Sequence, residues 1–394
     1  MSDNKAIKQL IGKTFMDIAD AMQTGRFGSR VRVGLTTLGS EHGISNLVKG
    51  AELAAADSEG IDIVLIGPKV ETRLEVIEAN SEPEMYRKME ELLDSGYINA
   101  CVTMHYSFPI GVSTVGKVVT PAMGKEMFIA TTTGTASAHR VEAMVRNALY
   151  GIITAKAMGI QEPTVGILNL DGARQVERIL MDLNVNGYKI RFAESIRSDG
   201  GAVMRGNDLL AGSVDVMVTD TLTGNILMKV FSSYTTGGSY EAMGCGYGPG
   251  VNESYDRIIL ILSRASGVPV VANAIGYAAK LAAGKLTQVA KEEFSKAKAA
   301  KLNELLSAAA REVKRAEKNE SVEAPEKEVV TGTIAGVDIM ELDDAVSALW
   351  KASIYAESGM GCTGPIIMVN EEKIEKSRDV LASAGFLASA GKVC

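Results

Sequence analysis

Short apolar runs alternate with amphipathic stretches along most of the chain. The runs are rich in β-branched residues, as buried strands are, and the stretches repeat apolar residues every three or four positions, as helices do. The expected strands cover residues 31–35, 61–66, 100–103, 164–170, 189–192, 214–219 and 268–272. Strands that alternate with helices form the βαβ units of a parallel sheet. The pattern therefore predicts an α/β fold with doubly wound, mostly parallel sheets.

Helical spacing marks the segments around these strands. The expected helices cover residues 7–22, 44–56, 141–158, 287–321 and 342–357, with a last helix from residue 371. The helix at 141–158 is long enough to carry the chain from one domain to the next, and residues 318–330 have the composition of a linker.

Five segments follow from these patterns, because a chain of 394 residues usually forms two domains. They are an N-terminal helix at 1–30, a first α/β domain at 31–155, a second at 156–285, a long helix and linker at 286–330, and a C-terminal module at 331–394, which we expect to pack on the first domain.

Composition indicates which kinds of partner the protein can bind and in which compartment it works. The formal net charge of -7 provides no broad positive surface for nucleic acid or for an acidic membrane. The four cysteines are widely spaced, and the chain begins without an apolar stretch of the kind found in signal peptides. No apolar run approaches the length of a membrane span. We therefore expect a cytoplasmic protein that binds neither nucleic acid nor membrane.

A glycine-rich segment at 244–250 is the first candidate for binding an anion. It precedes Asn252 and an apolar spacing that predicts a helix, so its backbone N–H groups and the positive end of the helix dipole would suit phosphate. Gly246, Gly248, Gly250 and Asn252 are the predicted phosphate-binding residues. The alternative is a tight turn with no ligand. A dinucleotide site is disfavoured because a helical segment, rather than a strand, precedes the glycines.

Hydroxyl and amide side chains gather just before two further predicted helices. Thr132 and Thr133 precede the helix that begins near His139, and Asp220, Thr223 and Asn225 follow the strand at 214–219. A helix N-terminus suits an anion, so we predict phosphate contacts at the two threonines. Open α/β sheets bind ligands where a strand ends, so we predict substrate contacts at the other three residues. Helix capping is the alternative explanation.

Cys362 is the best candidate for a nucleophile. Small neighbours at 358–365 leave its thiol accessible, and their backbone N–H groups could form an oxyanion hole. Cys101 ends a predicted buried strand, which favours a packing role. His105 follows that strand and could act as a general acid or base, although it could equally be an ordinary loop residue. The three histidines are too scattered to indicate a metal site.

Residues 31–285 resemble the phosphate acyltransferase of phospholipid synthesis, which shares its architecture with phosphotransacetylases and isocitrate-dehydrogenase-like folds. The resemblance rests on residues 38–43, 165–170 and 220–225. It implies the formation of acyl phosphate from an acyl thioester and phosphate. This chain has Arg174 and Arg178 where that family has a lysine, so Arg174 is a further predicted phosphate contact.

Over nearly its whole length, including residues 244–250 and the tail with Cys362, the chain is similar to the alpha subunits of component C of glycine/sarcosine/betaine reductase. The resemblance implies that Cys362 carries an acetyl thioester that phosphate cleaves to acetyl phosphate, and that Cys101 is a second functional cysteine. It also implies a beta subunit of component C and the selenoprotein component A as partners, an oligomer, and phosphate as co-substrate without a tightly bound cofactor.

Two other functions stay open on the sequence. A free-standing phosphate acyltransferase would use thioesters of coenzyme A or acyl carrier protein and would not need Cys362. A non-catalytic scaffold subunit would use its glycine segments only as structure. A dehydrogenase of the related fold is a more distant alternative.

Overall fold

A computed structural model of the chain describes residues 30–58, 60–196, 201–316, 322–361 and 364–387, with six scattered positions between 12 and 22. Most of the predicted N-terminal helix, together with Cys362 and Cys394, lies outside the described residues. The chain divides into two compact units. Unit 1 consists of Met1–Ser107, Met228–Gly250 and Tyr255–Thr287, and unit 2 of Phe108–Leu227, Val251–Ser254 and Gln288–Cys394. The chain therefore passes between units several times, rather than once near residue 155 as predicted.

Unit 1 contains a mostly parallel sheet with the strand order β3-β2-β1-β4-β12-β11. All neighbours are parallel except β11 and β12. The strands are β1 (Val31–Thr36), β2 (Ile61–Gly67), β3 (Glu75–Glu78), β4 (Ala100–Thr103), β11 (Gly248–Val251) and β12 (Ile259–Ile261). The central strands β1, β2 and β4 are largely buried, as strands covered on both faces are. Because these strands are continuous apolar runs, their positions were predicted well from the sequence.

Three helices of unit 1 are α2 (Gly43–Asp57), α3 (Glu82–Asp94) and α8 (Val268–Ala283). Gly50 lets α2 approach α8 closely, since a Cβ on Gly50 would lie 2.6 Å from Val271. The strand predicted at 268–272 is wrong, because these residues are the first turns of α8. The helix is buried along most of its length, and a short apolar run does not distinguish a buried helix from a buried strand.

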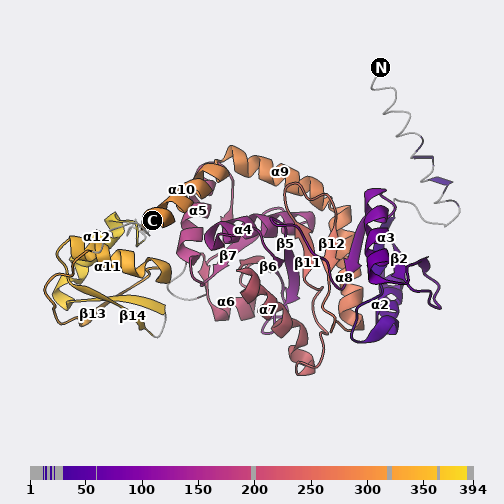
Figure 1. Cartoon of the computed structure of the whole chain (residues 1–394), viewed down its shortest axis with the longest axis horizontal. Coiled ribbons are helices and arrows are strands. Elements are labelled where there is room, and N and C mark those ends of the chain that lie inside the picture. Colours follow the sequence, from indigo (N-terminus) through magenta and orange to yellow (C-terminus); the bar gives the residue numbers. More distant parts are fainter. Residues whose placement is uncertain are drawn as a thin grey trace, which may run out of the picture. The chain divides into compact units, whose positions relative to one another are not determined.

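Unit 2 has the strand order β5-β6-β10-β7-β8, and β9 also pairs with β7. Only β5 and β6 are antiparallel. The strands are β5 (Ser113–Val119), β6 (Glu126–Gly134), β7 (Thr164–Leu168), β8 (Arg191–Phe192), β9 (Val203–Met204) and β10 (Val216–Val218). Both sheets are mostly parallel and accompanied by helices, so the predicted fold class is confirmed (Figure 1).

Outside the C-terminal module, the helices that lie wholly or partly in unit 2 are α4 (Arg140–Ala157), α5 (Ala173–Val185), α6 (Gly206–Ala211), α7 (Thr221–Ser233), α9 (Leu286–Ala299) and α10 (Leu302–Ala316). The single helix predicted at 287–321 is in fact the pair α9 and α10. The break occurs at Lys301, which has a φ of 68°, a left-handed conformation that ends a helix.

A buried carboxylate fastens α9 to the rest of unit 2. Glu293 accepts hydrogen bonds from Lys156 of α4 at 2.6 Å, from the Tyr188 hydroxyl at 2.8 Å and from Lys296 at 2.7 Å. Burial by itself would raise the pKa of Glu293, but these three donors together hold it below its ordinary value. Glu293 is therefore ionised and fully paired at neutral pH.

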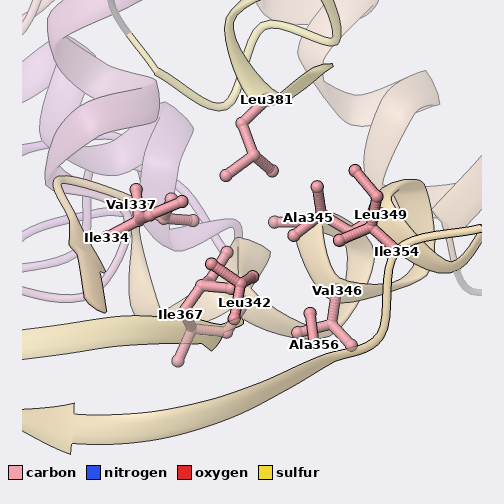
Figure 2. Close-up of a cluster of buried hydrophobic side chains, with 11 residues drawn as sticks. Ile334, Val337, Leu342, Ala345, Val346, Leu349, Ile354, Ala356, Ile367 and Leu381 are labelled. Atoms are coloured by element: carbon pink, nitrogen blue, oxygen red, sulfur yellow. The ribbon is translucent and has the colours of Figure 1, made fainter. Parts of the chain in front are cut away.

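The C-terminal module is a small antiparallel sheet with helices packed on it (Figure 1). Its elements are β13 (Gly332–Ala335), the 3-10 helix η2 (Ile339–Glu341), α11 (Leu342–Lys351), β14 (Ala356–Gly361), β15 (Gly364–Val369), the 3-10 helix η3 (Glu371–Lys373) and α12 (Ile374–Ser383). Figure 2 shows its own apolar core, to which Leu349 of α11, Ile367 of β15 and Leu381 of α12 contribute.

Two local predictions for the module have the wrong bounds. The helix predicted to reach residue 357 ends at Lys351, because Ser353 adopts a left-handed φ of 60°. The glycine turn predicted at 359–364 is instead largely strand, with Gly359 opposite Ile366 and Gly361 opposite Gly364. The module also contacts α5 of unit 2 through Asp338 and Glu341, and α5 lies outside the predicted first domain on which we expected it to pack.

Within the described ranges, no helix is long and apolar enough to cross a membrane. Nor do any three His, Cys, Asp or Glu side chains in those ranges lie close enough together to hold a metal ion.

Candidate functional site

Three helices of unit 2 begin at the same edge of its sheet. The strands β6, β10 and β7 are parallel neighbours, so their carboxyl ends lie side by side. The helices α4, α7 and α5 follow these ends directly. We call residues 131–140, 169–174 and 219–225 the strand-end surface. Open α/β sheets bind their ligands at this edge, and the positive ends of helix dipoles favour anions there.

Hydrogen bonds join the start of α7 to the end of β6. The Asn225 side-chain amide donates to the Thr132 carbonyl at 3.1 Å, and the Thr221 hydroxyl donates to the Gly134 carbonyl at 2.9 Å. A glycine is required at position 224 for α7 to lie this close to β6, because a Cβ there would lie 1.7 Å from the Thr131 carbonyl oxygen. The Asn225 amide thus holds the backbone that shapes the surface, and its contact with substrate stays a prediction.

Asp220 joins α7 to α4. One carboxylate oxygen accepts from the Thr223 backbone N–H at 2.8 Å and thereby caps α7. The other oxygen accepts from the Arg140 guanidinium at 2.6 Å. Arg140 also lies 3.6 Å from Asp171, and its side chain is 46% exposed. The predicted residues Asp220 and Thr223 therefore lie together, beside a cation that can still be reached from solvent.

Arg140 was not among the predicted site residues. The feature that could have identified it is its position, since it is the first residue of the helix that follows the threonine-rich segment 131–135. A guanidinium at a helix start, between two carboxylates, presents donors in a planar fork that suits phosphate oxygens.

The two predicted phosphate-binding threonines have different environments. Thr132 is fully buried, and its hydroxyl lies 2.7 Å from the Thr114 hydroxyl of β5. Thr133 is the next residue of β6, and it is half-buried. Thr132 therefore supports the strand end, while Thr133 is the better placed of the two to meet a ligand.

Arg174 is occupied by contacts within the protein. Its guanidinium pairs with Glu177 of the same helix at 2.9 Å, and its backbone N–H donates to Asp338 at 3.2 Å. These contacts give Arg174 a structural role at the start of α5. Its side chain is 40% exposed, and its contact with phosphate stays a prediction.

The glycine segment at 244–250 does not lead into a helix, which corrects our interpretation of it. Residues 252–258 are loop, and the apolar positions beyond them form β12, which pairs antiparallel with β11. A Cβ on Gly246 would lie 2.7 Å from the Leu262 side chain. Gly246, Gly248 and Gly250 are buried in unit 1, and the helix dipole that motivated a phosphate site is missing.

Asn252, the remaining member of that predicted site, belongs to unit 2. Its side-chain amide donates to the Gly111 carbonyl at 2.6 Å and lies 3.4 Å from the Tyr150 hydroxyl. Its side-chain oxygen accepts from the Ser254 backbone N–H at 3.0 Å. Asn252 therefore fixes the turn at Gly111.

The predicted catalytic residues differ in accessibility. Cys101 is 0% exposed within β4, and burial raises the pKa of its thiol, so it is poorly suited to form a thiolate. His105 is exposed just after the same strand, in unit 1. Cys362 lies outside the described residues, although the strands on either side of it are paired up to Gly361 and Gly364.

The chain matches the family model described as "Fatty acid synthesis protein" over residues 31–368. It is 70% identical over 388 residues to the glycine/sarcosine/betaine reductase complex component C subunit alpha of Peptoclostridium acidaminophilum, an alignment that covers 98% of this chain and 100% of that protein. It is 28% identical over 229 residues to the phosphate acyltransferase of Thermotoga petrophila, covering 51% of this chain and 67% of the relative. A solved branched-chain phosphotransacylase from Enterococcus faecalis V583 is similar with a TM-score of 0.45 and 15% identity, covering 64% of this chain and 99% of that structure.

Proposed function

The chain belongs to the family of glycine/sarcosine/betaine reductase component C alpha subunits, and on that premise we propose that it transfers an acetyl group from an enzyme-bound thioester to phosphate. The observation that carries this proposal is the 70% identity, which extends over the whole of the component C relative. The phosphate acyltransferase relatives support the phosphate half of the reaction.

The proposed reaction is a single acyl transfer. An oxygen of hydrogen phosphate attacks the carbonyl carbon of an acetyl thioester on Cys362, and a new carbon–oxygen bond replaces the carbon–sulfur bond. Acetyl phosphate leaves, and the phosphate proton passes to the sulfur or to water. Backbone N–H donors would stabilise the negative oxygen of the intermediate, and one such donor is typically worth about 3 kcal/mol.

The strand-end surface is the proposed phosphate site. Arg140 would supply the charge and the half-buried Thr133 a hydroxyl, while the start of α7 contributes its dipole. Asp220 would act as a positioning residue, since it caps α7 and holds the Arg140 guanidinium.

The proposal also includes the protein partners, the co-substrate and the compartment. The component C relative is named as a subunit of a complex, which supports partner proteins. The partners that we propose are a beta subunit of component C and the selenoprotein component A, which would donate the acyl group. Phosphate would be the co-substrate, with no tightly bound cofactor, and the complex would act in the cytoplasm.

A second candidate is a free-standing phosphate acyltransferase, which the 28% identical relative favours. Such an enzyme would take its acyl group from coenzyme A or acyl carrier protein. It would not need a thioester on Cys362.

Exchange of radiolabelled phosphate into acetyl phosphate separates these functions. A thioester on Cys362 predicts exchange by the purified chain without coenzyme A, and its loss in Cys362→Ala. Exchange that requires coenzyme A and survives Cys362→Ala would identify the free-standing enzyme. No exchange, together with no heat of phosphate binding in titration calorimetry, would identify a scaffold.

A further inference from the structure

The C-terminal module and the sheet of unit 2 have separate apolar cores. The module core contains eleven buried residues, all between 334 and 381. Figure 2 shows these side chains converging on one another. The contacts between the module and α5 described above are polar. Bodies with separate cores and a polar contact resemble domains that move relative to one another.

The first contact lies at the N-terminus of α5. Gly172 occupies the N-cap position with a φ of 84°, and glycine has no side chain with which to cap a helix. Asp338 supplies the missing acceptor. Its Oδ1 accepts from the Gly172 N–H and its Oδ2 from the Arg174 N–H, each at 3.2 Å. Asp338 is only 5% exposed, so this carboxylate is enclosed at the positive end of the helix.

The second contact lies further along the same face of α5. Glu341 accepts from the Gln175 side-chain amide at 3.1 Å and pairs with Arg178. Arg178 also donates to the Gly385 carbonyl at 2.7 Å, just beyond α12. Residues 172, 175 and 178 are spaced by three, so they lie on one face. This face holds the module at two points that are distant in its sequence.

The two carboxylates of the module are not equivalent. Burial raises the pKa of Glu341 even though Arg178 and Gln175 act in the opposite direction, so an ionised Glu341 gains little from being enclosed. Asp338 differs in accepting two backbone N–H groups at a helix start, where the helix dipole favours a negative charge.

We propose that residues 338–341 form a latch that docks the C-terminal module on the first two turns of α5, and that the module leaves α5 as a folded body when the Asp338 contact is weakened. The latch lies against the strand-end surface itself, because Gly172 and Arg174, which donate to Asp338, belong to residues 169–174 of that surface. This inference concerns docking and does not depend on the proposed acyl transfer.

Asp338→Asn is the sharpest variant. Asp338 Oδ1 also caps η2 by accepting from the Met340 N–H at 2.9 Å, and asparagine keeps that oxygen. Its NH₂ group, however, would then face the Arg174 N–H, donor against donor. The variant therefore weakens the latch while preserving the start of η2. Asp343→Asn, an exposed position in the first turn of α11, removes the same charge from the module and is the control.

Hydrogen exchange followed by mass spectrometry measures docking at residues 172–176, and fluorescence of Trp350 measures folding of the module, since this is the only tryptophan in the chain. Trp350 donates to the Ala356 carbonyl inside the module. We expect Asp338→Asn to accelerate exchange about tenfold with Trp350 emission unchanged, and Asp343→Asn to match the natural protein.

If Asp338→Asn alters Trp350 emission, the variant has disturbed the fold of the module and no longer tests docking. Arg178→Ala then tests docking, because it changes no residue of the module. Faster exchange at 172–176 and a larger radius of gyration in X-ray scattering support the latch. Exchange and radius equal to those of the natural protein in Arg178→Ala, or unchanged exchange in a folded Asp338→Asn, would overturn it.

Discussion

The Arg140 guanidinium at the start of α4 donates to the Asp220 carboxylate, which caps α7, over a distance of 2.6 Å. The two residues are 80 positions apart in sequence, and parallel pairing of β6 with β10 brings them together. One carboxylate thus both starts a helix and orients a half-exposed cation at the carboxyl edge of the sheet. This pair is the centre of the proposed phosphate site.

Arg140→Ala should lower phosphate exchange about 100-fold, because it removes the fork of donors expected to bind phosphate. Arg140→Lys should recover only part of the loss, since a lysine keeps the charge without the fork. The measurement is the rate of exchange as a function of phosphate concentration. Arg146→Ala is the matched control, because Arg146 pairs with Glu142 within α4. Equal losses in the two alanine variants would remove Arg140 from the site.

Gly224→Ala should destabilise unit 2, because its Cβ would lie 1.7 Å from the Thr131 carbonyl oxygen, a backbone atom that cannot move aside. We expect a loss of about 3 kcal/mol in the free energy of unfolding, measured by urea denaturation. Gly276 of α8 is the control, since nothing lies within 4 Å of its added Cβ. Gly276→Ala should be stabilising by about 0.5–1 kcal/mol. A neutral Gly224→Ala would mean that α7 does not approach β6 so closely.

Glu293→Gln should lower the free energy of unfolding by about 3 kcal/mol at pH 7, since it leaves buried donors without their carboxylate. The pKa of Glu293 is depressed in the folded state, so its contribution is present above the ordinary glutamate pKa and disappears as the pH falls through the folded-state value. The difference between the two proteins should therefore shrink in acid.

Urea denaturation at a series of pH values measures this dependence. The control is the exposed neighbouring carboxylate, changed in Glu292→Gln, which should have little effect at any pH. A difference between Glu293→Gln and the natural protein that stays constant into acid would contradict the assigned ionisation.

The fold was largely predictable, and the errors have physical causes. Parallel strands such as β1 and β2 are buried on both faces, so they appear in the sequence as continuous β-branched runs. The same signal misled at 268–272, where α8 is buried along most of its length. At 255–262 the apolar residues have helical spacing, but the segment contains the strand β12. The predicted anion site therefore has no helix behind it.

The candidate site was only partly predictable. The position of Asp220, Thr223 and Asn225 after a strand was predictable, because a loop after a buried strand is recognisable locally. Arg140, the partner of Asp220, was not predictable in this way, because only the pairing of β6 with β10 brings the two residues together. For the same reason nothing in the sequence linked Asp338 to Gly172, which lies 166 residues away.

The central claim is that an acetyl group passes between Cys362 and phosphate. Its most direct test is mass spectrometry of peptides after incubation of the purified chain with acetyl phosphate. We predict one acetyl adduct on Cys362 that phosphate removes, that is lost in Cys362→Ala, and that persists in Cys101→Ala, since Cys101 is buried. An adduct that forms equally in Cys362→Ala, or the absence of any acetyl thioester on Cys362 while phosphate exchange proceeds, would contradict the account.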